Sequence, residues 1–140
     1  MKKKGFSLIE LLTVVAIIGI ITAVGVVSYT GYVSAARKSS AENAMQQIAL
    51  AQAEYYSNIG QYFPTTSTCT EATDLTSGSI ESNLFDGGDI ITEESGYQMC
   101  IELIKSGTTY KITAISSRDD CKLTMTGELG SKPKEESGFC

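Results

Sequence analysis

An uninterrupted apolar run near the N-terminus constrains this chain more than any other feature. The 22 residues from Phe6 to Val27 carry a single formal charge, on Glu10. As an α-helix they span about 33 Å at the standard rise per residue, enough to cross the hydrocarbon core of a bilayer. The run therefore predicts a membrane-compatible helix, and the Ser-, Thr- and Gly-rich remainder of the 140 residues predicts one separate soluble domain.

The order of features around this run differs from that of a secretory signal peptide. Lys2, Lys3 and Lys4 precede it and the next basic residue is Arg37, so the positive-inside rule places the N-terminus in the cytoplasm and the later chain outside. A secretory signal has its small residues after a shorter apolar stretch. Here the small residue, Gly5, comes before the apolar run, which indicates a different kind of leader.

The helix is predicted to continue well beyond the apolar run, from about Phe6 to Ile59. No proline occurs before Pro64, and Gly60 is a typical helix stop. Such a helix is roughly 80 Å long, so we expect its first half to project from the domain and to need another partner for its apolar surface. Apolar residues mark one face of its later turns at a spacing of three or four: Tyr29, Val33, Ala36, Ala44, Ile48, Tyr55 and Ile59.

The remainder of the chain predicts a loop followed by a small sheet. Residues 60–96 lack periodicity and are expected to form a long loop. Residues 97–126 show period-two alternation broken by turn residues, which predicts an antiparallel meander of three to four strands. Its apolar face would cover the C-terminal half of the helix, an α+β fold, and residues 127–140 look irregular. The three clear strand segments are Tyr97–Leu103, Tyr110–Ala114 and Leu123–Met125.

The four cysteines predict two disulfides in an exported domain. Cys69, Cys100, Cys121 and Cys140 all lie on the predicted external side, in an even count and without Cys-x-x-Cys pairs. Three pairings are possible, and closure over short sequence distances favours Cys69–Cys100 with Cys121–Cys140. The strand alternation places Cys100 and Cys121 on opposite faces, which argues against their pairing.

The segment Lys4-Gly5-Phe6-Ser7-Leu8-Ile9-Glu10 resembles the class III signal of type IV prepilins, closely over the first 30 residues and loosely over the whole chain. The resemblance implies cleavage between Gly5 and Phe6 by a prepilin peptidase, N-methylation of the new Phe6 amine and a filament in which the helices bundle. It divides the chain into a leader (1–5), a transmembrane and filament-core half of the helix (6–28) and a headgroup (29–140) whose region 121–140 is closed by a disulfide.

Glu10 is the predicted assembly residue. A carboxylate in a membrane segment costs up to about 2.5–3.5 kcal/mol at mid-bilayer. We expect it to form a salt bridge with the Phe6 amine of a neighbouring subunit, which neutralises both charges and fixes the axial register. The alternative is a carboxylate that only reaches the lipid headgroups from a shallow position.

The middle of the apolar run departs from the pattern of many long-helix pilins, which carry proline where this chain has Val27. Gly19 and Gly25 are therefore the candidates for local helix melting on assembly, because glycine costs about 1 kcal/mol relative to alanine in a helix. The alternative is that both glycines permit close packing of helices.

Other constellations point away from catalysis and from ligands. Asp86 and Asp89 flank two glycines and are a candidate for a calcium loop, but such turns are typically solvated, and we expect no metal and no cofactor. The absence of histidine excludes a Ser-His-Asp system, so no enzyme is predicted. Removing the three leader lysines leaves eight basic against sixteen acidic residues, a charge of −8, so charge predicts no nucleic-acid binding.

The sequence thus predicts a structural subunit: a type IVa-like major or abundant pilin that starts in the inner membrane and ends in an extracellular filament. Its partners would be further copies of itself, the prepilin peptidase, the inner-membrane assembly platform and minor pilins. The filament would serve adhesion, twitching motility or DNA uptake. The alternatives are a type II secretion pseudopilin, a minor pilin acting as a binding module, and an uncleaved single-pass anchor.

Overall fold

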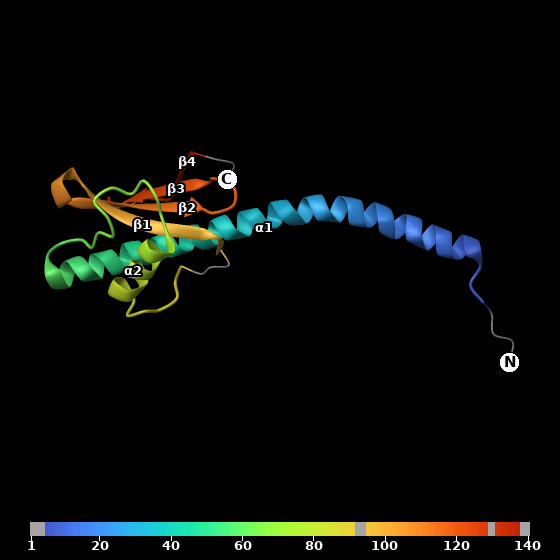
Figure 1. Ribbon diagram of the computed structural model, residues 1–140, viewed down its shortest axis with the longest axis horizontal. Helices are drawn as coiled ribbons and strands as arrows, with labels where there is room; N and C mark the ends of the chain where they lie inside the picture. The colour runs from blue at the N-terminus through green and yellow to red at the C-terminus, as the bar shows by residue number, and fades with distance from the viewer. Residues whose placement is uncertain (1–4, 92–94, 129–130, 138–140) are drawn as a thin grey trace. The chain divides into compact units, whose positions relative to one another are not determined.

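The computed structural model describes residues 5–91, 95–128 and 131–137, and the chain divides into two compact units, residues 1–34 and 35–140. Figure 1 shows the elements in chain order. They are the helices α1 (Leu8–Ile59) and α2 (Asp74–Leu84), the strands β1 (Tyr97–Ile104), β2 (Thr109–Ser116), β3 (Lys122–Thr126) and β4 (Lys134–Ser137), and a short 3-10 helix at Lys105–Gly107.

Helix α1 confirms the predicted long helix. It begins at Leu8, two residues after the predicted start, and ends at Ile59 as predicted. The following Gly60 adopts a φ of +82°, which glycine reaches without steric cost, and its N–H donates to the Tyr56 carbonyl at 2.8 Å. In the first unit, every residue of α1 up to Val26 is exposed.

In the second unit, the later turns of α1 form one wall of the core. Ala41, Ala44, Met45 and Ile48 are buried there at the helical spacing of three and four. The sequence pattern identified Ala44 and Ile48 correctly, but Ile59 in the last turn remains 53% exposed. The buried face is therefore shorter than the apolar periodicity suggested.

The opposite wall is the predicted antiparallel sheet, with four strands in the order β1-β2-β3-β4. The register places the predicted apolar residues in two rows across β1, β2 and β3, all buried. These rows pack with the α1 residues in a single core cluster, so the α+β arrangement is confirmed. The rows are Met99, Ala114 and Leu123, and Ile101, Ile112 and Met125.

The other face of the sheet is also covered at its centre, which simple alternation did not predict. Cys100, Thr113 and Thr124 lie opposite one another in the register and are 0%, 0% and 8% exposed. Cys100 carries a disulfide to Cys69, from the segment that precedes α2. A strand that is buried on both faces loses the polar half of its alternating pattern.

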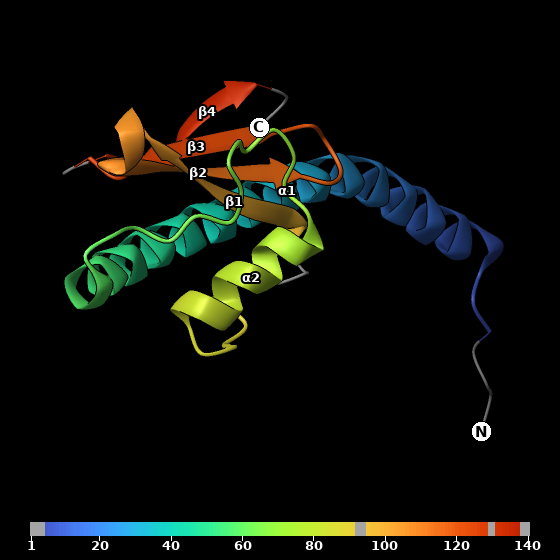
Figure 2. The same cartoon turned by 60° about the vertical axis from the view of Figure 1, so that its left-hand side comes forward.

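The prediction of a loop throughout residues 60–96 is wrong for residues 74–84, which form α2. Thr73 caps this helix: its hydroxyl accepts from the Thr76 N–H, and the Thr76 hydroxyl accepts from the Thr73 N–H. Only Ser77 and Ile80 are buried, and the sequence is rich in residues of low helix propensity. The helix therefore depends on its cap and on contacts with β1 beside it, which no periodic pattern reveals (Figure 2).

The prediction of irregular structure over residues 127–140 is wrong for residues 134–137, which form β4 at the free edge of the sheet. It pairs antiparallel with β3, with a register shift between Lys122 and Leu123. The strand is polar and gives no alternation signal. Its two glutamates form ion pairs that fasten it to neighbouring elements: Lys38–Glu135 to α1 and Lys122–Glu136 to β3.

A buried glutamine fixes the chain where it leaves α1. Gln52 is completely buried, and its side-chain amide donates to the Phe63 carbonyl at 2.6 Å and accepts from the Phe63 N–H at 2.9 Å. Both halves of the amide are satisfied, as a buried polar group requires. The pair of bonds holds the segment after Gly60 against the helix.

We predict that Gln52→Leu lowers the stability of the second unit by about 1–3 kcal/mol, because it leaves both main-chain groups of Phe63 without partners. Urea unfolding of the full chain in detergent micelles, followed by tyrosine fluorescence, measures the change. Gln47→Leu is the control, since Gln47 is exposed on the same helix and surface changes stay within about 0.5 kcal/mol. Equal losses for both variants would contradict the role of the Gln52 amide.

Candidate functional site

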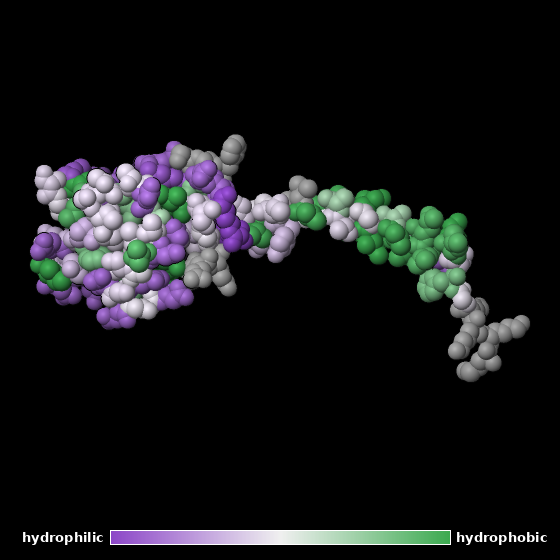
Figure 3. Space-filling model, viewed as in Figure 1, coloured by the Kyte–Doolittle hydropathy of each residue, from purple (hydrophilic) through white to green (hydrophobic). Residues whose placement is uncertain are grey.

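The first candidate site is the exposed apolar part of α1 in the first unit. The helix contains an 18-residue window with a mean hydropathy of 2.6 and no burial, so by length and composition it is able to cross a membrane. Figure 3 shows mostly apolar side chains on the visible face of this part of the helix. A surface of this kind needs a lipid or protein partner, because soluble monomers rarely expose large contiguous apolar patches.

The hydroxyl side chains within this segment are compatible with an apolar environment. Thr13 and Thr22 donate to the carbonyls of Ile9 and Ile18, four residues earlier, at 3.0 Å and 2.6 Å. Hydroxyls that bond back to the helix leave no unpaired donor. The segment therefore satisfies its own hydrogen bonds, as a span in lipid or in a bundle of apolar helices must.

Glu10 lies in the first turn of α1 and bonds to its own backbone. Its Oε2 accepts from the Ser7 N–H at 2.8 Å, the reach-back bond that a glutamate makes at the third position of a helix. This contact satisfies one of the N-terminal donors that a helix leaves unpaired. The sequence identified Glu10 by its charge and its place in the signal motif, and the reach-back bond was not predicted.

The predicted cleavage site precedes α1 in chain that is open to solvent. Gly5 and Phe6 are both exposed, and Phe6 retains 85% of its accessible surface. Neither residue is helical, and exposed irregular chain is the usual substrate of proteases. The lysines of the leader lie outside the described residues, and both cleavage and methylation at Phe6 stay predictions.

Gly19 and Gly25 are both helical in this structure, because α1 runs without interruption from Leu8 to Ile59. A Cβ atom added at either glycine would meet no other atom within 4 Å. Their predicted roles, local melting or close helix packing, concern the assembled state and stay predictions.

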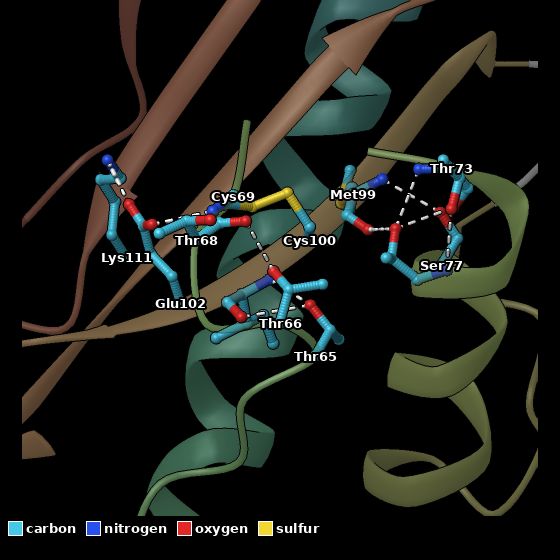
Figure 4. Close-up of a disulfide and its surroundings, with 12 residues drawn as sticks. Thr65, Thr66, Thr68, Cys69, Thr73, Ser77, Met99, Cys100, Glu102 and Lys111 are labelled. Carbon is cyan, nitrogen blue, oxygen red and sulfur yellow. Dashed lines mark hydrogen bonds and ion pairs between the residues drawn. A yellow bond between two sulfur atoms is a disulfide. The ribbon is translucent and has the colours of Figure 1, made fainter. Parts of the chain in front are cut away.

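The second candidate site is the disulfide of the second unit. Cys69 and Cys100 are bonded, with their Cα atoms 5.9 Å apart and both side chains buried (Figure 4). This is the first of the two pairings that the sequence favoured. Cys121 is completely buried, and its predicted partner Cys140 lies outside the described residues, so the second pairing stays a prediction.

Side-chain hydroxyls on both sides of Cys69 cover the outer edge of β1. Thr65 accepts from the Ile101 N–H at 2.8 Å and donates to the Ile101 carbonyl at 3.1 Å. Thr76 donates to the Met99 carbonyl, and Ser77 accepts from the Met99 N–H (Figure 4). These bonds occupy the groups through which an edge strand recruits other strands. The Thr- and Ser-rich composition of this region thus has a structural role that the sequence did not disclose.

Glu102 joins the disulfide segment to the sheet. Its Oε1 forms an ion pair with Lys111, its cross-strand neighbour, and its Oε2 accepts from the Cys69 N–H at 2.8 Å. Partial burial alone would raise the pKa of this carboxyl. The hydrogen bonds from Lys111 and from the Cys69 backbone, with the Lys111 charge, outweigh it and lower the pKa.

We predict that the second unit loses folding stability in acid because Glu102 becomes protonated. The pKa of Glu102 is lower in the folded state than in the unfolded state. Its contribution to folding stability is therefore complete above the unfolded-state pKa and disappears as the pH falls through the folded-state pKa. Glu102→Gln should be less stable than wild type at pH 7. An unperturbed carboxyl group has a pKa of about 4, so the two proteins should be equally stable well below pH 4. Unfolding curves of both proteins across pH measure this, and a pH-independent difference would contradict it.

The acidic turn after α2 is explained by its hydrogen bonds. Glu81 accepts from the N–H groups of Ile90 and Ile91 at 3.0 Å and 2.8 Å, which closes the turn. Asp86 and Asp89 are exposed on it. Across the described ranges, no group of three or more His, Cys, Asp or Glu side chains is arranged to hold a metal ion. The geometry of this turn gives no support to calcium binding at Asp86 and Asp89.

Charge is unevenly distributed along the second unit. Residues 39–104 contain ten acidic residues and no basic one. All but two of the eight basic residues that follow the leader come after residue 104. Ion pairs neutralise Lys38, Lys105, Lys111 and Lys122. In the part of the chain that the structure describes, no ion pair involves Arg37, Arg118, Lys132 or Lys134.

Comparison with known protein families gives two matches that adjoin along the chain. Residues 1–26 match the prokaryotic N-terminal methylation motif. Residues 27–126 match a family described as type IV minor pilin ComP, DNA uptake sequence receptor. No curated protein and no solved structure matches the chain. The second match covers 100 of the 140 residues, more than half of the chain.

Proposed function

This chain belongs to the family of the type IV minor pilin ComP, and on that premise we propose that it is a subunit inserted along the shaft of a type IV pilus, where it displays its second unit to ligands. The methylation motif at residues 1–26 supports entry by the prepilin route. The chain is a type IV pilin, and pilins are structural proteins. The family match favours a minor pilin over the major or abundant one that the sequence suggested.

The observation that carries the proposal is the exposed apolar part of α1. Its most apolar 18-residue window has a mean hydropathy of 2.6, and none of that window is buried within the chain (Figure 3). Lipid covers it before assembly, and neighbouring α1 helices replace the lipid in the filament. Both environments accept a helix whose backbone bonds are internal.

Processing at Phe6 supplies the second half of the assembly contact. We propose that prepilin peptidase cleaves the exposed Gly5–Phe6 bond on the cytoplasmic side and that the new amine is N-methylated. The ammonium of Phe6 then pairs with Glu10 of the adjacent subunit. Because both charges lie in an apolar core, each is costly alone and tolerable only when paired.

The proposed location changes during this route. The prepilin sits in the inner membrane through residues 6–28, with its leader (1–5) in the cytoplasm and residues 29–140 outside. The assembly platform then transfers the mature chain into the extracellular filament, among other pilins. In the shaft, Glu10 has a charge partner on the adjacent subunit, whereas a single-pass anchor offers it none. This difference distinguishes the proposed subunit from such an anchor.

We predict that Glu10→Gln is cleaved at Phe6 and stays in the membrane but falls at least tenfold in filaments sheared from the cell surface. Glutamine keeps an acceptor for the Ser7 N–H and removes only the charge. Immunoblots of sheared and membrane fractions, with the intact mass of the mature chain, measure both steps. Glu71→Gln, which changes an exposed acid of the second unit, should assemble normally. Wild-type filament levels for Glu10→Gln would refute the charge pair.

A second function, DNA reception, is favoured by the description of the matching family. The charge distribution restricts where DNA would bind, because phosphates avoid the acidic residues 39–104. We propose that any DNA contact uses exposed cations without ion-pair partners near β4, above all Lys132 and Lys134. Few phosphate contacts imply modest affinity and a shallow salt dependence.

We predict that Lys132→Ala and Lys134→Ala each lower the slope of log affinity against log salt by about 1, as loss of one phosphate contact does. Fluorescence anisotropy of the full chain in neutral detergent with labelled duplex DNA measures the slope. Glu71→Gln is the control and should leave the slope unchanged. Absence of binding at low salt would exclude DNA reception by this subunit alone and leave the pilus role untouched.

A further inference from the structure

A polar groove of 370 Å³ lies between the last turns of α1 and the C-terminal end of α2. Its volume is in the range of small-ligand sites. None of the proposed steps of pilus assembly involves this groove. The side chains that give it chemical character are Glu54, Tyr55 and Asn58 from α1 and Asn83, Phe85 and Asp86 from α2 and the residues that follow.

The two walls of the groove are set by ordinary helix geometry. Glu54 and Asn58 are four residues apart on α1 and therefore lie on the same face of the helix. On the other wall, α2 ends at Leu84, and the N–H of its cap residue Phe85 donates to the Glu81 carbonyl. Asp86 follows with a φ of +51°, so the chain turns sharply there.

The electrostatic field in the groove favours a positive charge. Glu54 and Asp86 are exposed carboxylates that only accept hydrogen bonds when ionised. The groove also lies at the negative end of α2, which has no basic residue in its last turn. Since residues 39–104 contain no basic residue at all, no cation of that segment neutralises the two carboxylates.

Aromatic rings and amides add contacts beyond charge. Tyr55 and Phe85 are half-buried, and the Tyr55 ring is held edge-on against Phe63 with centroids 5.6 Å apart. A ring held in this way can offer its face to an ammonium group or to the apolar side of a sugar. The amide nitrogen of Asn83 donates to the Ser79 carbonyl, which orients its oxygen as an acceptor for a ligand hydroxyl.

We propose that this groove binds a sugar that carries a protonated amino group. The ammonium is held by Glu54 and Asp86, the hydroxyls donate to the carboxylates and to the amides of Asn58 and Asn83, and a ring face packs on Tyr55 or Phe85. Acceptors outnumber donors in the lining, as a ligand with many hydroxyl donors requires. This ligand would give the displayed domain an adhesive target, and its binding does not depend on filament formation.

Calorimetric titration of the full chain in neutral detergent tests the proposal, with the glucosamine trimer as the probe. We expect Glu54→Gln and Asp86→Asn each to weaken binding at least fivefold. Asparagine tolerates the positive φ at residue 86, so the fold is kept. Glu71→Gln is the matched control, an exposed acid that does not line the groove, and should bind as wild type does.

Two further titrations identify the ligand class. The N-acetylglucosamine trimer lacks the ammonium and should bind at least fivefold more weakly than the glucosamine trimer. Spermidine carries ammonium groups without a sugar ring and should bind more weakly as well. Equal binding of either compound, or an unchanged affinity in Glu54→Gln and Asp86→Asn, would overturn the proposal. Normal filament levels of both variants would show that assembly is separate from this groove.

Discussion

The hydrophobic surface of the first half of α1 is the constraint on which the rest of the structure depends. Thirteen large apolar side chains between Phe6 and Val26 are exposed. Burial of each side chain would contribute about 1.5–3 kcal/mol, so leaving all of them in water gives up about 20–40 kcal/mol of stabilisation. A folded domain is stable by only about 5–15 kcal/mol. The second unit therefore has no stability with which to offset this surface, and the helix must pass directly from lipid to other helices.

A subunit that polymerises through a helix must not polymerise through its sheet. Both edges of the sheet are protected against strand addition. The outer edge of β1 is occupied by the hydroxyls of Thr65, Thr76 and Ser77 and fixed by the disulfide. The other edge is β4, short and charged, as edges that resist pairing are. The surface left for assembly is thus that of α1, which carries the proposed Glu10 contact.

The parts predicted from the sequence are those in which a local rule and the fold agree. Helix α1, three strands and the Cys69–Cys100 pairing follow from period and spacing. Helix α2 and strand β4 were missed because they depend on tertiary contacts: Ile80 in the core for one, and ion pairs such as Lys38–Glu135 for the other. Gln52 was missed for the same reason, since a buried glutamine in a helix looks like a solvated one until its partner, Phe63, is placed. The groove beside α2 could not be predicted without α2.

Polymerisation also changes what weak binding sites can do. The groove has two carboxylates and is open to solvent, and the cations near β4 are few, so neither surface supports tight binding by one subunit. Where several copies are displayed on one filament, each further contact to the same target is intramolecular, with an effective concentration that reaches the millimolar range for close sites. Weak single contacts also dissociate quickly and are therefore reversible. A strongly basic or deeply pocketed domain would gain affinity per subunit but would lose this reversibility. The acidic, shallow surface of this pilin is therefore suited to multivalent binding through several weak contacts.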